Sequence, residues 1–341
     1  MHNKTLKVYS SYLQISRYRS MKFSVVTPLW QDRPASENIE VAKLADRLGF
    51  SELWIGEMAT YDAFAFATAV GLQTRQIGLS IGPLSVSVRT PMNIAMGAAS
   101  VADLTGRRPN IALGASSTVV VEEWHGRERA RTATHIDETA QILRTLLDGE
   151  KANFSGQLAS CHGYRLRLDA PATPLTIAAF GPAAVRAAAR RADRMLLNMV
   201  TPASLAALRT QLAEAATKAE RETPQLAVWL PCAVDPDRES MDQLKRGIVG
   251  YLAAPGYGEM MMAAGFADLV AFARTRPHPR EILAAMPDEL IAAIGLLGDT
   301  AAIASRVEQY RTAGADEICL VPATAGDEFG ERTLSAMAAR A

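Results

Sequence analysis

After Met21, the chain alternates between two hydrophobic patterns. Short apolar runs, typical of buried strands, are followed by longer stretches in which apolar residues recur at helical spacing. In the first such pair, residues 22–29 (KFSVVTPL) form an apolar run, and Ser36 can then cap a helix that continues to Gly49. This repeated order of strand and helix is typical of a parallel sheet with helical crossovers.

The number of apolar runs distinguishes between two α/β folds. They predict eight strands, at residues 22–29, 51–56, 76–82, 110–115, 175–179, 194–199, 225–234 and 317–322. A closed barrel needs eight strands, whereas an open doubly wound sheet usually has fewer and a glycine-rich first turn. The first turn here is Thr27-Pro28-Leu29-Trp30, and no GxGxxG sequence occurs. We therefore predict a (β/α)8 TIM barrel with helical insertions, as one domain over residues 21–341.

Three segments depart from the barrel pattern. Residues 150–172 have a more broken pattern, with Gly156, Gly163 and Pro171, and form either a hairpin lid or a surface insertion, which we favour. Residues 237–297 look wholly helical, and the methionines at 260–262 are more typical of core packing than of a site. Residues 1–20 are basic but lack the apolar stretch of a signal peptide, so we interpret them as a disordered or mis-started extension.

Composition and charge exclude several classes of function. The 36 basic and 36 acidic residues balance, so electrostatics do not favour nucleic acid or an anionic membrane as partner. The three cysteines, Cys161, Cys232 and Cys319, are far apart and have neither disulfide nor zinc-site spacing, which favours a reducing cytoplasm. No apolar run approaches the length that crosses a bilayer, about 20 residues.

In a (β/α)8 barrel the active site is built from residues that follow the carboxyl ends of the strands. That rule selects a set of strand-end positions: 27–30, 57–58, 80–84, 116–118, 178–183, 198–201, 232 and 321–324. Catalytic and cofactor-binding groups are expected among them.

The most informative strand end is Ala178-Ala179-Phe180-Gly181-Pro182-Ala183, where a strand meets a helix through a Gly-Pro turn. Free amides and the positive end of the dipole make a helix N-terminus suitable for a phosphate. Because proline has no amide hydrogen, Gly181, Ala183 and Ala184 would be the donors. The same sequence can also form an ordinary tight connection.

Two further strand ends carry candidate residues. Around Ser80, Ile81 and Gly82, small residues would allow a flat ring to approach the backbone, although the strand could also simply stop at Gly82-Pro83. Glu57 follows the apolar run Leu53-Trp54-Ile55 and is a candidate site residue, with helix capping as the alternative.

Other catalytic chemistries have little support. His125 lies after the fourth strand, on the expected active face, but a loop histidine without a role is the commoner case. No Ser-His-Asp order, HExxH, P-loop or metal-ligand cluster occurs, so hydrolase and metalloenzyme functions, and any metal site, are not indicated.

Short segments in a fixed order along the chain resemble one known family. They are ADRLGF at 45–50 with LWIGE at 53–57, IGLSI at 77–81, RTP at 89–91, DLTGRR at 103–108, IAAFGP at 177–182, ADR at 192–194, LGD at 297–299 and GADE at 314–317. Together they resemble the luciferase-like monooxygenase superfamily. The branch that depends on coenzyme F420, which includes methylenetetrahydromethanopterin reductase, looks most similar.

The resemblance implies a fold, a cofactor and a site. It implies the barrel argued above, with coenzyme F420 or alternatively FMN as cofactor. The ring would lie over a bulge with a non-proline cis peptide at Ser80-Ile81, the phosphate would lie at residues 179–183, and Glu57 would contact the ring or its hydroxyl. It also implies a small-molecule substrate and a homodimer.

Because the chain departs from the family pattern at two positions, the residue that would donate a proton to the substrate is not identified. Several relatives have a histidine where this chain has Met58, and many have an acidic residue where this chain has Ser117. Glu57, Thr118, His125 or water are the candidates that are left. The competing functions are therefore an F420-dependent oxidoreductase, an FMN-dependent monooxygenase and a non-catalytic cofactor-binding protein.

Overall fold

The computed structural model describes residues 21–339. The proposed N-terminal extension, residues 1–20, lies outside the described residues.

Eight parallel strands form a closed barrel, which confirms the predicted (β/α)8 fold. Each strand pairs with its neighbours in the order β1-β2-β3-β4-β7-β8-β9-β11, and β11 pairs again with β1. The strands are β1 (Lys22–Val26), β2 (Glu52–Ile55), β3 (Gly78–Ser85), β4 (Asn110–Gly114), β7 (Leu175–Ala178), β8 (Arg194–Asn198), β9 (Gln225–Val234) and β11 (Glu317–Pro322).

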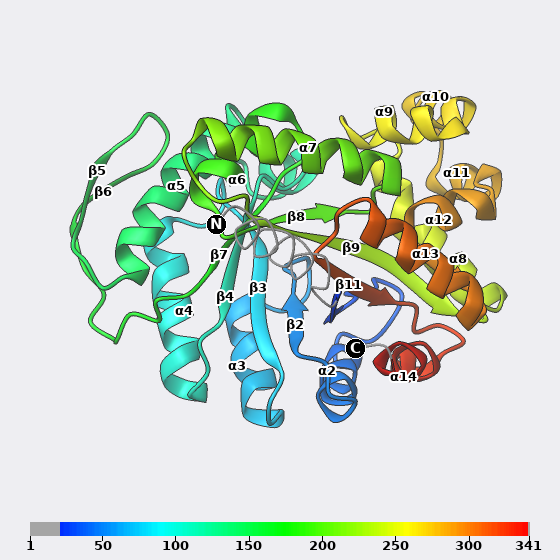
Figure 1. Cartoon of the computed structure of the whole chain (residues 1–341), viewed down its shortest axis with the longest axis horizontal. Helices are drawn as coiled ribbons and strands as arrows, with labels where there is room; N and C mark the ends of the chain where they lie inside the picture. Colours follow the sequence, from blue (N-terminus) through cyan, green and yellow to red (C-terminus); the bar gives the residue numbers. More distant parts are fainter. Residues whose placement is uncertain (1–20, 340–341) are drawn as a thin grey trace, which may run out of the picture.

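Helices surround the barrel and follow the predicted order (Figure 1). They are α2 (Glu37–Arg47), α3 (Ala63–Gln73), α4 (Pro91–Thr105), α5 (Thr132–Leu147), α6 (Pro182–Arg191), α7 (Pro202–Lys218), α13 (Thr300–Thr312) and α14 (Glu331–Ala338). Outward-facing strand residues pack against their buried faces in one large apolar core.

The two insertions lie on opposite sides of the barrel in Figure 1. Residues 150–172 contain an antiparallel hairpin of β5 (Ala152–Ser155) and β6 (Ser160–Tyr164). Residues 237–297 are not wholly helical, because turns separate several short helices and a short strand ends the segment. These elements are α8 (Arg238–Ile248), η3 (Val249–Tyr251), α9 (Tyr257–Met261), η4 (Met262–Phe266), α10 (Ala267–Arg274), α11 (Pro279–Ala285), α12 (Asp288–Ile294) and β10 (Leu296–Gly298).

The interior of the barrel is filled in layers. Residues of alternate strand positions point inward, so each strand contributes to several layers. The middle layer is apolar and almost fully buried, and consists of Val26, Trp54, Ala112, Leu196, Ala227 and Cys319. Beneath it, toward the amino ends of the strands, the interior is polar.

This lower layer centres on the guanidinium of Arg194, which lies between two buried carboxylates. Its Nη1 is 2.6 Å from Oε2 of Glu317, and its Nη2 is 2.7 Å from Oε1 of Glu52. Arg194 Nε donates to Thr176, and the guanidinium lies 4.3 Å from the centre of the Trp54 ring. Burial opposes ionisation of Glu52, but Arg194 and Lys22 outweigh it and hold the pKa of that carboxyl well below its usual range. The layer therefore joins β1, β2, β7, β8 and β11 from inside.

Another buried carboxylate, that of Glu138, anchors the β5–β6 hairpin to α5. Glu138 accepts hydrogen bonds from the amides of Gln157, Leu158 and Ala159 at 2.8 to 2.9 Å. Burial opposes its ionisation, yet these amides lower the pKa of the carboxyl. A Cβ at Gly156 would collide with the same carboxylate, so the turn needs glycine to approach it.

We expect Arg194→Met to lower the free energy of unfolding by about 3–5 kcal/mol, because it leaves Glu52 and Glu317 buried without their shared cation. Arg190→Met, which breaks the more exposed pair with Asp137, should cost less than about 1 kcal/mol. Urea unfolding followed by circular dichroism measures both. Equal losses would contradict a central role for the lower layer.

Glu138→Gln should lower the free energy of unfolding by about 1–2 kcal/mol at pH 7, because a neutral amide accepts the three hydrogen bonds less strongly. The folded-state pKa of Glu138 is lowered, so its contribution is present above the unfolded pKa of about 4.3 and is lost as pH falls. The two proteins should therefore converge in stability below about pH 4. Thermal melts across pH test this, with exposed Glu214→Gln as control.

Candidate functional site

The carboxyl ends of the barrel strands carry a third interior layer, which we call the upper layer. All of its members are small or apolar except Ser85, Asn198 and Trp229, which carry polar side-chain groups. The members are Leu29, Gly56, Pro83, Ser85, Gly114, Ala178, Asn198, Trp229 and Val321. A Cβ added at Gly56 would touch Leu29 and Trp229, and one at Gly114 would touch Pro83 and Ala178. All but Gly114 are partly exposed, whereas the middle layer is buried. The barrel interior is thus more exposed to solvent at this end than in the middle layer.

A bulge in β3 shapes the floor of the upper layer. The register between β3 and β4 shifts between Ile81 and Leu84. Gly82 has a φ of +123°, and a Cβ at this position would collide with the backbone of Ala112, so the bulge needs glycine here. The cis peptide within the described residues is Gly82-Pro83, so the expected cis bond at Ser80-Ile81 is corrected. An X-Pro bond adopts cis far more readily than a non-proline bond does.

The side chains of two predicted cofactor contacts in β3 lie outside the upper layer. Ser80 is fully buried in the lower layer, where its hydroxyl contacts Glu52 and accepts from Arg194 at 3.1 Å. Ile81 is fully buried in the core outside the barrel. The strand continues beyond the predicted end at residue 82, so the residues at its carboxyl end are Gly82 to Ser85 instead.

Three polar atoms near the upper layer are buried without a hydrogen-bond partner among the described residues. They are Oγ of Ser85, Oγ of Ser87 and Nε1 of Trp229. Buried polar groups are normally paired, so such atoms indicate a missing partner. No sequence motif identifies these atoms, although Ser85 and Ser87 lie just beyond the strand-end positions 80–84.

The predicted phosphate turn follows β7 at the rim of the upper layer. Ala179 is buried, Phe180 is half-buried, and Gly181, Pro182 and Ala183 are exposed at the start of α6. No side chain caps this helix, and nothing lies within 4 Å of a Cβ at Gly181. In α7, by contrast, Thr201 caps the equivalent turn through the amide of Ser204. The amides at the start of α6 are thus accessible.

Glu57 lies after β2 as predicted, but it is engaged by Arg89. The guanidinium donates from Nε to Oε2 at 2.8 Å and from Nη2 to Oε1, and it also pairs with Asp62. Oε1 further accepts from the amide of Ala63 at 3.2 Å. The arrangement fastens the loop after β2 to the loop after β3. Both carboxylate oxygens of Glu57 are therefore engaged by hydrogen bonds within the chain.

The other predicted catalytic residues lie in the loop after β4. Thr118 precedes the short π-helix η2 (Val119–Trp124), and His125 follows it; both are exposed. Met58 and Ser117, the two departures from the family pattern, are exposed as well. Neither Thr118 nor His125 is brought into the upper layer.

An aromatic group from the 237–297 insertion reaches the upper layer at Asn198. Burial raises the pKa of the phenols of Tyr251 and Tyr257, and the side chain of Asn198 partly offsets that rise. The two tyrosine rings meet edge to face at 5.0 Å, and Tyr257 packs 5.1 Å from Phe180 of the phosphate turn. Asn198 belonged to a selected strand end, but no local signal identified the tyrosines, which lie more than 50 residues away in sequence.

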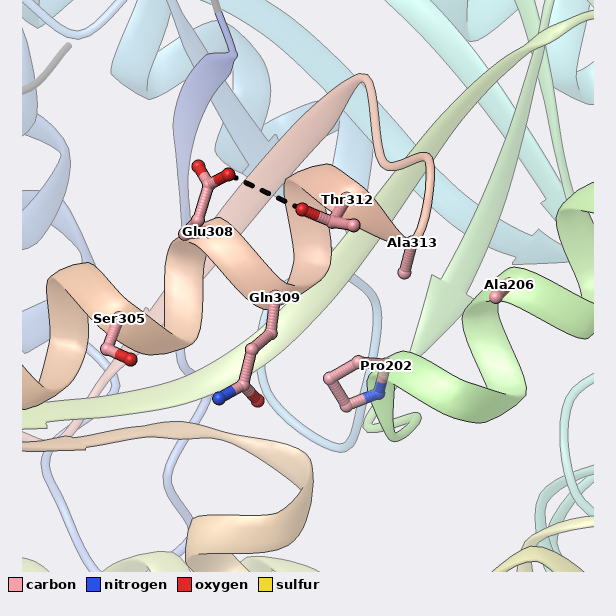
Figure 2. Close-up of a pocket in the computed structure, with 7 residues that line it drawn as sticks. All are labelled: Pro202, Ala206, Ser305, Glu308, Gln309, Thr312 and Ala313. Carbon is pink, nitrogen blue, oxygen red and sulfur yellow. Dashed lines mark hydrogen bonds between the residues drawn. The ribbon is translucent and has the colours of Figure 1, made fainter.

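A depression on the surface and the strand-end residue Cys232 do not belong to this site. Figure 2 shows a shallow depression of 510 Å³ between α7 and α13, lined by residues of the outer helices such as Pro202 and Gln309. Cys232 points into the apolar core, and its burial raises the pKa of the thiol.

Residues 21–339 include no cluster of three or more potential metal ligands. Within the same range, none of the helices combines the length and apolarity needed to cross a bilayer.

Comparison with known proteins identifies the family. The chain is 22% identical to 5,10-methylenetetrahydromethanopterin reductase of Archaeoglobus fulgidus over 81% of this chain and 86% of that protein. Its structure is similar to that of the coenzyme F420-dependent tetrahydromethanopterin reductase of Methanopyrus kandleri, with a TM-score of 0.79, 17% identity and coverage of 94% and 97%. The oxygenating constituent of 3,6-diketocamphane monooxygenase from Pseudomonas putida, in complex with FMN, superimposes with a TM-score of 0.68 at 16% identity, covering 93% and 96%. The family model described as luciferase-like monooxygenase matches residues 21–317. The chain therefore belongs to the luciferase-like monooxygenase family.

Proposed function

We propose that this oxidoreductase binds coenzyme F420 in the upper layer and transfers a hydride between the deazaflavin and a small organic substrate. The observation that carries the proposal is the open, small-residue floor of the upper layer, bordered by buried polar atoms without partners. The tetrahydromethanopterin reductase of Methanopyrus kandleri adds support, because its name includes coenzyme F420.

The floor suits a flat ring system. Gly56, Pro83, Gly114 and Ala178 keep side-chain atoms away from the centre of the barrel end, so a planar ring can approach the backbone. Flavin-type rings carry carbonyl and nitrogen acceptors around their edge. The unpartnered hydroxyls of Ser85 and Ser87 and the indole N–H of Trp229 are donors of the kind such acceptors need.

The start of α6 suits the cofactor phosphate. Ala183 and Ala184 offer amides in the first turn, the helix dipole favours an anion, and no capping side chain competes for them. Phe180 connects this turn to the upper layer. We therefore retain residues 179–183 and Gly82 as cofactor-binding and replace Ser80 and Ile81 with Ser85, Ser87 and Trp229.

When bound, F420 supplies two-electron hydride chemistry, and the chain supplies position and surroundings. The apolar floor orients the ring, and the middle layer closes the barrel beneath it to water. Glu57 acts indirectly, because its pairing with Arg89 fixes the loops after β2 and β3 that border the ring. FMN with oxygen chemistry is the second candidate, since the same floor accepts either ring and one structural neighbour holds FMN.

Coenzyme F420 should quench the tryptophan fluorescence of the purified protein, because Trp54 and Trp229 lie in the barrel interior next to the proposed ring position. FMN should quench it far less at the same concentration. Titration of each cofactor gives the two dissociation constants. Tighter binding of FMN than of F420 would overturn the choice of cofactor.

Ala183→Asp should weaken F420 binding about 10- to 100-fold, because it places a carboxylate beside the proposed phosphate. The matched control is Ala203→Asp, which occupies the same position after a proline at the start of α7. Both substitutions place an acidic residue in a first helical turn, which helices tolerate well. Equal affinities of the two variants would argue against phosphate binding at α6.

A further inference from the structure

Two neighbouring helices on the outside of the barrel, α3 and α4, carry almost no charge (Figure 1). The sequence of α3 has no charged residue, and that of α4 has Asp103 alone. Each of the other six barrel helices carries at least two charged residues. A helix on the surface of a globular protein normally turns a charged side toward water. The outward sides of α3 and α4 therefore differ from the rest of the barrel surface.

Exposed apolar side chains are concentrated on the same two helices. Within residues 21–339, ten large apolar side chains are exposed, and five of them lie on α3, on α4 or in the loop that leads into α3. These five are Met58, Tyr61, Leu72, Met96 and Leu104. Leu72 is 67% exposed and Leu104 is 61% exposed. Single exposed apolar residues are common on protein surfaces, but a contiguous group of them marks an interaction site.

The exposed and half-buried positions form one stripe along each helix, at the spacing of a single helix side. The helices pack directly together, because a Cβ at Gly97 would collide with the ring of Phe64, and a Cβ at Gly71 would collide with Thr105. The two stripes therefore lie side by side. We call them together the α3–α4 face, which consists of Ala65, Thr68, Ala69 and Leu72 on α3 and of Asn93, Met96, Gly97, Ser100 and Leu104 on α4.

The absence of charge from the α3–α4 face favours a second copy of this chain as its partner. In a two-fold symmetric interface, residues near the axis face their own copies, so a charged residue there would meet the same charge. An uncharged face avoids this repulsion. An anionic membrane surface would instead attract lysine and arginine, and the face has neither.

The shape of the face also suits packing against its own copy. Ala69 precedes Leu72 on α3, and Ser100 lies between Met96 and Leu104 on α4. Small residues leave grooves between the larger ones, and the larger side chains of one copy can fill the grooves of the other. The same side chains then act as both projections and hollows, as a symmetric interface requires.

The area of the face is large enough for the centre of a dimer interface. Helices of 11 and 15 residues are about 17 and 22 Å long and about 10 Å wide, so together they present about 400 Å2. A standard interface uses about 800 Å2 from each partner, with an apolar centre and a polar rim. The charged residues at the helix ends, such as Asp62, Arg75 and Arg108, would supply that rim.

We propose that two copies of this chain form a two-fold symmetric dimer through the α3–α4 face. The proposal concerns assembly and goes beyond the proposed cofactor chemistry, so either can fail while the other stands.

The first test places a charge on the face. Met96→Glu should raise the dissociation constant of the dimer at least about 100-fold, because symmetry buries the new carboxylate twice. Sedimentation equilibrium over a dilution series measures this constant, and the wild-type protein should approach twice the chain mass of 36.7 kDa. Leu168→Glu is the matched control, since Leu168 is 42% exposed against 46% for Met96 and lies outside the face. Circular dichroism checks the folding of both variants.

The second test locates the interface without changing the face. Spin labels are attached to Gln73→Cys, at the end of α3, or to Glu214→Cys on α7; both positions are exposed, and the native cysteines of residues 21–339 are buried. The strand before α7, β8, is four strands from β2 in the ring of eight, so α7 lies across the barrel from α3. Pulsed electron paramagnetic resonance should give a shorter distance between the two labels at residue 73 than between those at residue 214.

Three results would overturn the proposal. A wild-type protein that is monomeric at every concentration would leave the face to a different partner. A folded Met96→Glu variant that dimerises as tightly as Leu168→Glu would place the interface elsewhere. Labels that are closer at residue 214 than at residue 73 would do the same, even if Met96→Glu failed to fold.

Discussion

The guanidinium of Arg194 shared between Glu52 and Glu317 is the interaction on which the architecture of this barrel depends. It joins strands that are far apart in sequence, and its charges balance once Lys22 is included. Because the polar lower layer closes one end of the interior and the apolar middle layer seals it, only the opposite end is open. The proposed ligand site therefore lies at the end of the barrel opposite the buried charges.

Because of its bulge, β3 contributes residues to both the lower layer and the upper layer. Ser80 belongs to the lower layer and is held by Glu52 and Arg194, so the start of the strand is fixed. The shift of register after Ile81 then turns Ser85 toward the interior, opposite Gly114. One strand therefore contributes to the buried ion network at one end and to the proposed ring site at the other.

The fold could be predicted from sequence because each strand has an unbroken apolar run and each helix its own periodicity. The turn at residues 179–183, where we propose that the phosphate binds, could also be located from sequence, because Gly181-Pro182 marks both the strand end and the helix start. Alternation along β3 does not locate its bulge, so the sequence alone could not show that the side chain of Ser80 lies in the lower layer and that Ser85 is paired with Gly114. The neighbours of Glu57 and Asn198 could not be predicted from sequence. Arg89, which pairs with Glu57, and the two tyrosines near Asn198 come from other elements, and only the closed barrel brings them near.

The tyrosines next to Asn198 come from the insertion between β9 and β11, and no barrel strand carries them. The floor and the ion network are built from strands, whose residues are constrained by neighbours on every side. The insertion packs on the barrel rim and can vary in length and sequence without disturbing those layers. The side chains that the insertion places beside the proposed site are therefore separate from the strand residues that would hold the cofactor. Changes in this one segment could alter the substrate of such a barrel while the strand residues stay the same.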